Sequence, residues 1–80
     1  MQVKVLGAGC ANCHALGDRI DEALRRLGVD GIVEMVTDYA QIASYGVMGT
    51  PALVVDEQVV VSGRVPEVRE LVSILAGSLA

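Results

Sequence analysis

The sequence predicts a small α/β protein with the element order β-α-β-α-β-β-α, in which helices flank a four-stranded mixed sheet. Two strand-like segments that each lead into a helical repeat, and two Val-rich runs before a last helical repeat, support this order. A length of 80 residues leaves room for one domain, residues 1–80. The hydrophobic share of 52% comes mainly from aliphatic side chains, which favours a branched core beneath a sheet.

The first strand and the first helix are predicted from two different periodicities. Residues 2–6 alternate polar and apolar side chains before a Gly-Ala-Gly segment, so we expect a strand that enters a tight loop. Apolar side chains then recur at helical spacing, at Leu16, Ile20, Leu24 and Leu27. Gly28 is placed to end this helix in a left-handed conformation.

The other face of this helix is charged. Its arrangement predicts ion pairs between Asp21 and Arg25 and between Glu22 and Arg26, four residues apart. The full charged set is Asp18, Arg19, Asp21, Glu22, Arg25 and Arg26. The simplest interpretation is a solvated helix face.

A second strand and a short second helix follow. Residues 31–36 form an apolar run suited to a strand. Asp38 is placed as an N-cap, with Gln41 three residues later, and the helix is expected to reach Tyr45 and to end at Gly46. A right-handed crossover then places the first two strands side by side.

A hairpin and a last helix complete the chain. Residues 52–55 and 58–62 are predicted to pair as antiparallel strands around a two-residue turn that lacks the usual glycine. Pro66 is expected to open the last helix, and residues 77–80 are expected to fray. The apolar positions of this helix are Val68, Leu71, Val72 and Leu75.

Charge and hydropathy exclude several classes of partner. The formal net charge is −4, and the basic residues form no cluster beyond Arg25 and Arg26, so we expect no nucleic-acid partner. No apolar run approaches the roughly 20 residues that span a bilayer, and no signal segment precedes the first strand, so we expect no membrane partner and a cytoplasmic location.

The two cysteines, Cys10 and Cys13, indicate redox chemistry. At the start of a helix, free backbone N–H groups and the helix dipole favour the thiolate, which makes Cys10 the candidate nucleophile. Cys13 lies one turn further, on the apolar side, and is the candidate resolving thiol. Asn12 and His14 are candidate modulators of this pair.

Other chemistries fit this motif less well. Residues 10–14, CANCH, match the pattern of c-type haem attachment, but the chain offers few aromatic residues to line a haem pocket. A zinc site needs four ligands, and only His14 is available besides the cysteines. We therefore expect no metal and no separate cofactor, with a redox-active disulfide between Cys10 and Cys13 as the reacting group.

Two segments together resemble the thioredoxin superfamily: GCANC at residues 9–13 and GVMGTPAL at residues 46–53. The chain looks most similar to small, glutaredoxin-sized redox-active disulfide proteins of this superfamily. The resemblance implies a minimal thioredoxin-like fold and a protein-disulfide reductase activity. It also implies that Pro51 is a cis-proline facing the disulfide, that the backbone of Thr50 binds substrate, and that Gly63 and Arg64 border the docking groove.

The resemblance also implies binding partners for this protein, and two alternative functions remain open. Protein disulfides are the expected substrates, an upstream thioredoxin-type reductase is the expected electron donor, and a monomer is the expected state. One departure is Lys4, which stands where thioredoxins commonly carry a buried acid. Two alternatives use the same cysteines: a soft-metal carrier of the copper type, whose domains usually have a different element order, and a non-catalytic redox adaptor.

Overall fold

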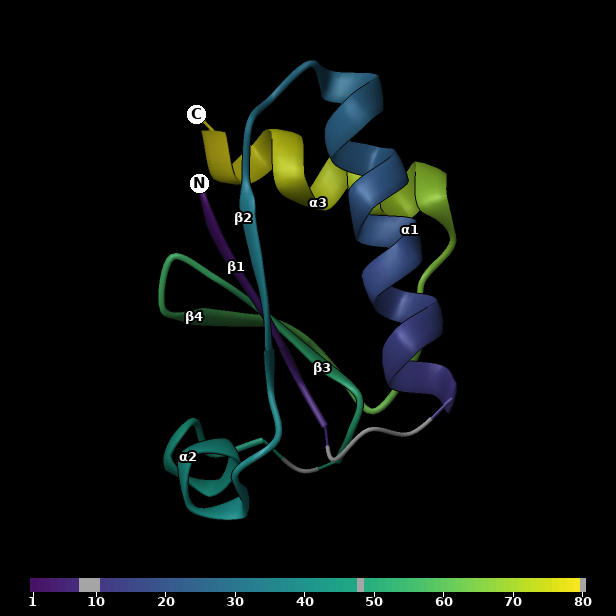
Figure 1. Cartoon of the computed structure of the whole chain (residues 1–80). Coiled ribbons are helices and arrows are strands. Elements are labelled where there is room, and N and C mark those ends of the chain that lie inside the picture. The colour runs from purple at the N-terminus through teal and green to yellow at the C-terminus, as the bar shows by residue number, and fades with distance from the viewer. Residues whose placement is uncertain (8–10, 48, 80) are drawn as a thin grey trace.

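The computed structural model describes residues 1–7, 11–47 and 49–79, and Cys10, the predicted nucleophile, therefore lies outside the described residues. The seven elements follow the predicted order (Figure 1). Their bounds are β1 Gln2–Leu6, α1 Ala11–Leu27, β2 Ile32–Val36, α2 Tyr39–Ser44, β3 Ala52–Val55, β4 Gln58–Ser62 and α3 Val68–Leu79.

The four strands form one mixed sheet with the order β2-β1-β3-β4. Strand β1 pairs in parallel with β2, with Lys4 opposite Glu34. On its other side β1 pairs antiparallel with β3, with Leu6 opposite Ala52, and β3 pairs antiparallel with β4. The predicted fold class, an α/β protein with a four-stranded mixed sheet and a minimal thioredoxin-like topology, is confirmed.

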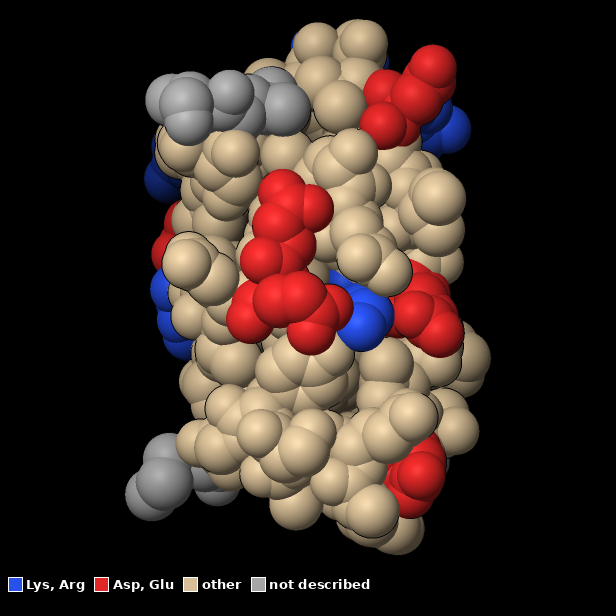
Figure 2. Space-filling model, turned by 90° about the vertical axis from the view of Figure 1, so that its left-hand side faces the viewer, with Lys and Arg blue, Asp and Glu red and all other residues tan. Residues whose placement is uncertain are grey.

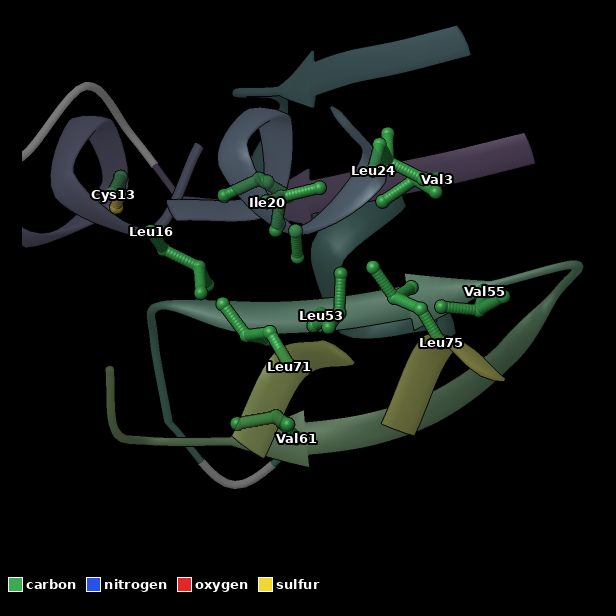
Figure 3. Close-up of a cluster of buried hydrophobic side chains, with 12 residues drawn as sticks. Val3, Cys13, Leu16, Ile20, Leu24, Leu53, Val55, Val61, Leu71 and Leu75 are labelled. Carbon is green, nitrogen blue, oxygen red and sulfur yellow. The ribbon is translucent and has the colours of Figure 1, made fainter. Parts of the chain in front are cut away.

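The larger core lies between the sheet and the helices α1 and α3 (Figures 1 and 3). Figure 3 shows side chains of β1, β3 and β4 pointing toward those of the two helices. The buried members are Val3, Val5, Cys13, Leu16, Ile20, Ala23, Leu24, Leu53, Val55, Val61, Leu71 and Leu75. Burial of this aliphatic set excludes water from the face of α1 that carries Cys13.

A smaller core lies on the opposite face of the sheet, beneath α2. Leu6, Val36, Ala52 and Val54 pack there with Ile42 of the helix. Helix α2 has only six residues, so it covers only one end of this face (Figure 1). No helix within the described parts of the chain is long and apolar enough to cross a bilayer.

Two helix ends have the caps that the sequence predicts. Gly28 has a φ of 66°, and a pair of hydrogen bonds closes α1, from Gly28 N to Arg25 O at 3.1 Å and from Val29 N to Leu24 O at 3.1 Å. At the start of α2, the carboxylate of Asp38 accepts a hydrogen bond from Ala40 N at 3.0 Å.

Some predicted boundaries were wrong by a few residues. Strand β2 begins at Ile32, one residue later than expected, and α3 begins at Val68 rather than at Pro66. The carbonyl of Pro66 accepts a hydrogen bond from Arg19, and the first helical hydrogen bond goes to Glu67 instead. Residues 77–79 belong to α3 rather than fraying, while residue 80 is outside the described range.

The charged face of α1 also differs from the prediction. The ion pair described there joins Arg25 to Glu22, three residues apart at 3.3 Å, in place of the two predicted pairs at a spacing of four. Arg19 is only partly solvated on that face, because its guanidinium donates a hydrogen bond to the carbonyl of Pro66 at 2.9 Å. It ties α1 to the segment that precedes α3.

Candidate redox site

Cys13 lies in the first part of α1 and is completely buried, with 0% exposure. Its side chain belongs to the core cluster that includes Leu16 and Ile20 (Figure 3). The neighbouring Asn12 and His14 are exposed on the other sides of the helix. The sequence-based placement of Cys13 on the apolar face is therefore confirmed, because a position in the helix three residues before Leu16 must share its face.

The parallel pairing of β1 with β2 continues to the residue that follows β1. Gly7 N donates a hydrogen bond to Val36 O at 2.9 Å, which extends the pairing one residue beyond Leu6. The chain leaves the sheet at this edge and enters α1 at Ala11. The start of α1 therefore lies at the end of the sheet where β1 ends and β3 begins.

Thr50 and Pro51 lie at this same end of the sheet. The peptide bond between them is cis, the isomer that the resemblance implies. Pro51 is buried and Thr50 is exposed. Since Ala52, the next residue, pairs with Leu6, the register of β1 and β3 places the proline beside the end of β1.

Gly63 lies directly beside Pro51. Its N–H donates a hydrogen bond to the carbonyl of Pro51 at 2.9 Å, and Ser62 Oγ donates to the carbonyl of Gly49 at 3.4 Å. Gly63 has a φ of 77°, a left-handed conformation that glycine adopts at little cost. The structure thus brings together Thr50, Pro51 and Gly63, three of the predicted substrate-binding residues.

Arg64, the fourth predicted substrate-binding residue, is engaged with α3. Its guanidinium donates two hydrogen bonds to the carboxylate of Glu70, at 3.1 and 2.6 Å. These bonds from Arg64 lower the pKa of Glu70 below its ordinary value. The bidentate pair holds the arginine against the first turn of α3.

Lys4 lies on the α2 face of the sheet, on the side opposite the core that contains Cys13. Its ammonium donates to Glu57 Oε1 at 2.8 Å and to the hydroxyl of Tyr45 at 2.9 Å. The hydrogen bond to Glu57 is the largest cause of a raised pKa for Lys4, and the same bond lowers the pKa of Glu57. The lysine is therefore a partnered cation.

Sequence reasoning missed Tyr45 and Glu57 as partners of Lys4. Three signals pointed toward them: a lysine between two valines of a strand, one of only two aromatic residues at the end of a short helix, and a hairpin turn without glycine. None of these signals shows which residues are in contact, because the contacts of Lys4 span 41 and 53 positions along the chain.

Comparison with known proteins agrees with this architecture. A family model described as a thioredoxin domain matches residues 1–76. A thioredoxin from Methanothermobacter thermautotrophicus is 36% identical over 76 residues, which cover 95% of this chain and 99% of that protein. A thioredoxin from Methanocaldococcus jannaschii is 32% identical over 69 residues, which cover 86% of this chain and 79% of that protein. The chain therefore belongs to the thioredoxin family, and this membership supports a function in thiol-disulfide oxidoreduction.

Proposed function

We propose that this protein reduces the disulfide bonds of other proteins, with Cys10 as the attacking thiol and Cys13 as the resolving thiol. The observation that carries the proposal is the complete burial of Cys13 on the core face of α1. A resolving thiol must be protected from outside disulfides and must still lie within one helical turn of the attacking sulfur. The spacing of the two cysteines satisfies the second condition.

The proposed reaction has two thiol-disulfide exchanges. The thiolate of Cys10 attacks one sulfur of the substrate disulfide, a mixed disulfide forms, and the other substrate sulfur leaves as a thiolate that takes up a proton. Cys13 then loses its proton and attacks the Cys10 sulfur, which releases the second substrate thiol. The substrate gains two electrons and two protons, and the protein is left with a Cys10–Cys13 disulfide.

An electron donor must then restore the dithiol. We assign this step to an upstream thioredoxin-type reductase, which supplies two electrons to the disulfide. We also propose that the cycle runs in the cytoplasm, because this compartment keeps thiols reduced. We propose that the protein acts there as a monomer. No other cofactor enters the proposed cycle.

The residues around Pro51 are proposed to hold the substrate. Thr50 is exposed immediately before the buried proline, and this exposure supports the proposal that its backbone N–H and C=O pair with an extended peptide, as an added strand. The carbonyl of Pro51 itself is already bonded to Gly63. Gly63 therefore acts as a support for the docking edge, and Arg64, held by Glu70, as its border.

Asn12 and His14 are proposed to modulate the reactivity of Cys10. Both are exposed beside the buried Cys13, and His14 also borders a shallow groove between α1 and β2 that includes Asp18 and Met35. Positions four apart are neighbours along a helical surface, so we expect a cationic imidazole at His14 to favour the thiolate of Cys10. A His14→Gln variant should slow alkylation of Cys10 at mildly acidic pH, and an unchanged rate would remove His14 from this role.

The central test is a trapping experiment with insulin as the substrate. Cys13→Ser should accumulate a mixed disulfide through Cys10, because the attacking thiol remains and the resolving thiol is gone. Cys13→Ala repeats the trap without placing a hydroxyl in the core. Cys10→Ser is the matched control and should capture nothing.

The wild-type protein should also reduce insulin repeatedly with dithiothreitol as electron donor. Failure of both trapping and turnover would overturn the proposal. An anaerobic titration that finds one tightly held Cu(I) ion, together with the absence of insulin reduction, would instead support a soft-metal carrier.

A further inference from the structure

Lys4, Tyr45 and Glu57 form a closed network on the face of the sheet that α2 leaves partly open. Lys4 donates to both partners, and the hydroxyl of Tyr45 donates to Glu57 Oε2 at 3.2 Å. The lysine side chain is only 17% exposed although it carries a charge. Figure 2 shows this side of the molecule, where acidic groups flank a basic group near the centre. The three residues tie β1, the end of α2 and the β3–β4 turn to one another.

The hairpin turn has a conformation that is unusual for its residues. Asp56 has a φ of 48° and Glu57 a φ of 71°, values that favour glycine or asparagine. Both side chains have long-range contacts: the carboxylate of Asp56 accepts from Gln2 N at 3.0 Å, and that of Glu57 accepts from Lys4 and Tyr45. A glycine at position 57 would suit the turn better but would remove the network. The glutamate is therefore explained by its side-chain contacts.

Tyr45 is the residue at which the chain leaves α2. It forms the C-cap of the helix, and Gly46, with a φ of 70°, redirects the chain toward Thr50 and Pro51. The tyrosine side chain packs against the small core beneath α2. At the other end of this segment, Gly63 N holds the carbonyl of Pro51. The segment between Tyr45 and Ala52 is thus held at both ends, by the network and by the sheet.

We propose that the Lys4–Tyr45–Glu57 network sets the position of the docking edge at Thr50 and Pro51, with Tyr45 as the positioning residue. This inference rests on the proposed disulfide-reductase function. None of the three side chains takes part in the thiol exchange. Loss of the network should weaken the binding of protein disulfides and leave the reaction of the cysteines unchanged.

The primary test compares two tyrosine-to-phenylalanine variants. Tyr45→Phe keeps the ring in the small core and removes only the hydroxyl, so KM for insulin should rise at least threefold while kcat stays within twofold. Reduction of a small disulfide, which needs no docking edge, should proceed at the parental rate. Tyr39→Phe is the matched control, because Tyr39 begins the same helix and is 75% exposed. It should leave both constants unchanged.

A second variant separates positioning from stability. Glu57→Gly gives the turn a residue suited to its φ, so the urea midpoint should stay at or above the parental value while KM for insulin rises as in Tyr45→Phe. A purely structural role predicts that stability and docking fall together. If Glu57→Gly retains the parental KM, the inference is overturned.

Amide hydrogen exchange tests the same inference without any activity. In Tyr45→Phe, the amides of Gly49 and Thr50 should exchange at least threefold faster, while those in the middle of α1 should be unchanged. Equal exchange rates in the parent and the variant would overturn the inference. If the wild-type protein fails to reduce insulin and the exchange rates still rise, the proposed function is wrong and the positioning effect of Tyr45 is supported.

Discussion

The N–H of Gly63 donates a hydrogen bond to the carbonyl of Pro51 at 2.9 Å, and this contact joins the loop before α3 to the start of β3. This hydrogen bond depends on the backbone conformation at Gly63. Gly63 has a φ of 77°, and its Cα lies 3.6 Å from the position that a Cβ on Gly49 would occupy. Two segments that are separated in the chain therefore meet closely, and both are parts of the proposed docking edge.

Replacement of Gly63 by alanine should destabilise the protein and weaken docking. No atom blocks a Cβ at this position, so the cost comes from the left-handed backbone and should be about 1–2 kcal/mol. The shifted N–H should also raise KM for insulin. Gly77→Ala, in the exposed surface of α3, is the control and should stabilise by roughly 0.5–1 kcal/mol. Urea unfolding measures both, and equal effects of the two substitutions would contradict this explanation.

Burial of Cys13 should protect it from alkylation. In a Cys10→Ser variant, Cys13 is the sole thiol, and its 0% exposure means that a reagent can reach it only after local opening. Iodoacetamide should therefore label the folded variant at least about a hundredfold more slowly than the same variant in urea, a ratio set by local opening. Mass spectrometry measures the rates. Labelling of the folded variant at the rate of an unfolded thiol would show that Cys13 is accessible.

Loss of the Arg19 guanidinium should loosen the contact between α1 and the segment before α3. Arg19→Met removes the 2.9 Å hydrogen bond to the carbonyl of Pro66 and should cost about 1 kcal/mol, since the group is partly solvated. The 3.9 Å ion pair of Arg19 with the exposed Glu67 should contribute almost nothing. Glu67→Gln is therefore the control. If urea unfolding shows equal losses of stability for Arg19→Met and Glu67→Gln, the effect belongs to the ion pair instead.

The contribution of Glu57 to stability should depend on pH in a defined direction. The hydrogen bond from Lys4 lowers the pKa of Glu57 in the folded state, so folding favours the ionised carboxylate. The stabilisation is fully present above the unfolded-state pKa, about 4.3, and is lost as the pH falls through the lower folded-state value. Lys4 stays charged throughout this range, because even the ordinary pKa of a lysine, about 10.4, lies well above it.

A Glu57→Gln variant measures this contribution by difference. The gap in stability between the parent and Glu57→Gln should be constant from pH 7 to about pH 5 and should shrink steadily toward pH 3, where the unfolded-state carboxyl is protonated. Comparison of the two proteins cancels the other acids, including Glu70, whose pKa is also lowered. Urea unfolding at constant ionic strength provides the data. A gap that widens on acidification would contradict the assigned pairing.

The sequence by itself determined the elements and the face on which Cys13 lies. Alternation in β1 and the helical spacing of Leu16, Ile20 and Leu24 are local patterns, because a strand repeats every two residues and a helix every three or four. The caps at Gly28 and Asp38 are equally local, since each acts on backbone groups only a few residues away. Local chemistry was sufficient for each of these features.

Only the tertiary structure decided how the elements meet. The contacts of Lys4 with Tyr45 and Glu57 span 41 and 53 positions, and the bond from Arg19 to Pro66 spans 47. That last bond engages the carbonyl of Pro66 two residues before α3 starts at Val68, and no local pattern around Pro66 contains this contact. Such pairings follow from the strand order and from the burial of both sheet faces, which no short sequence window contains.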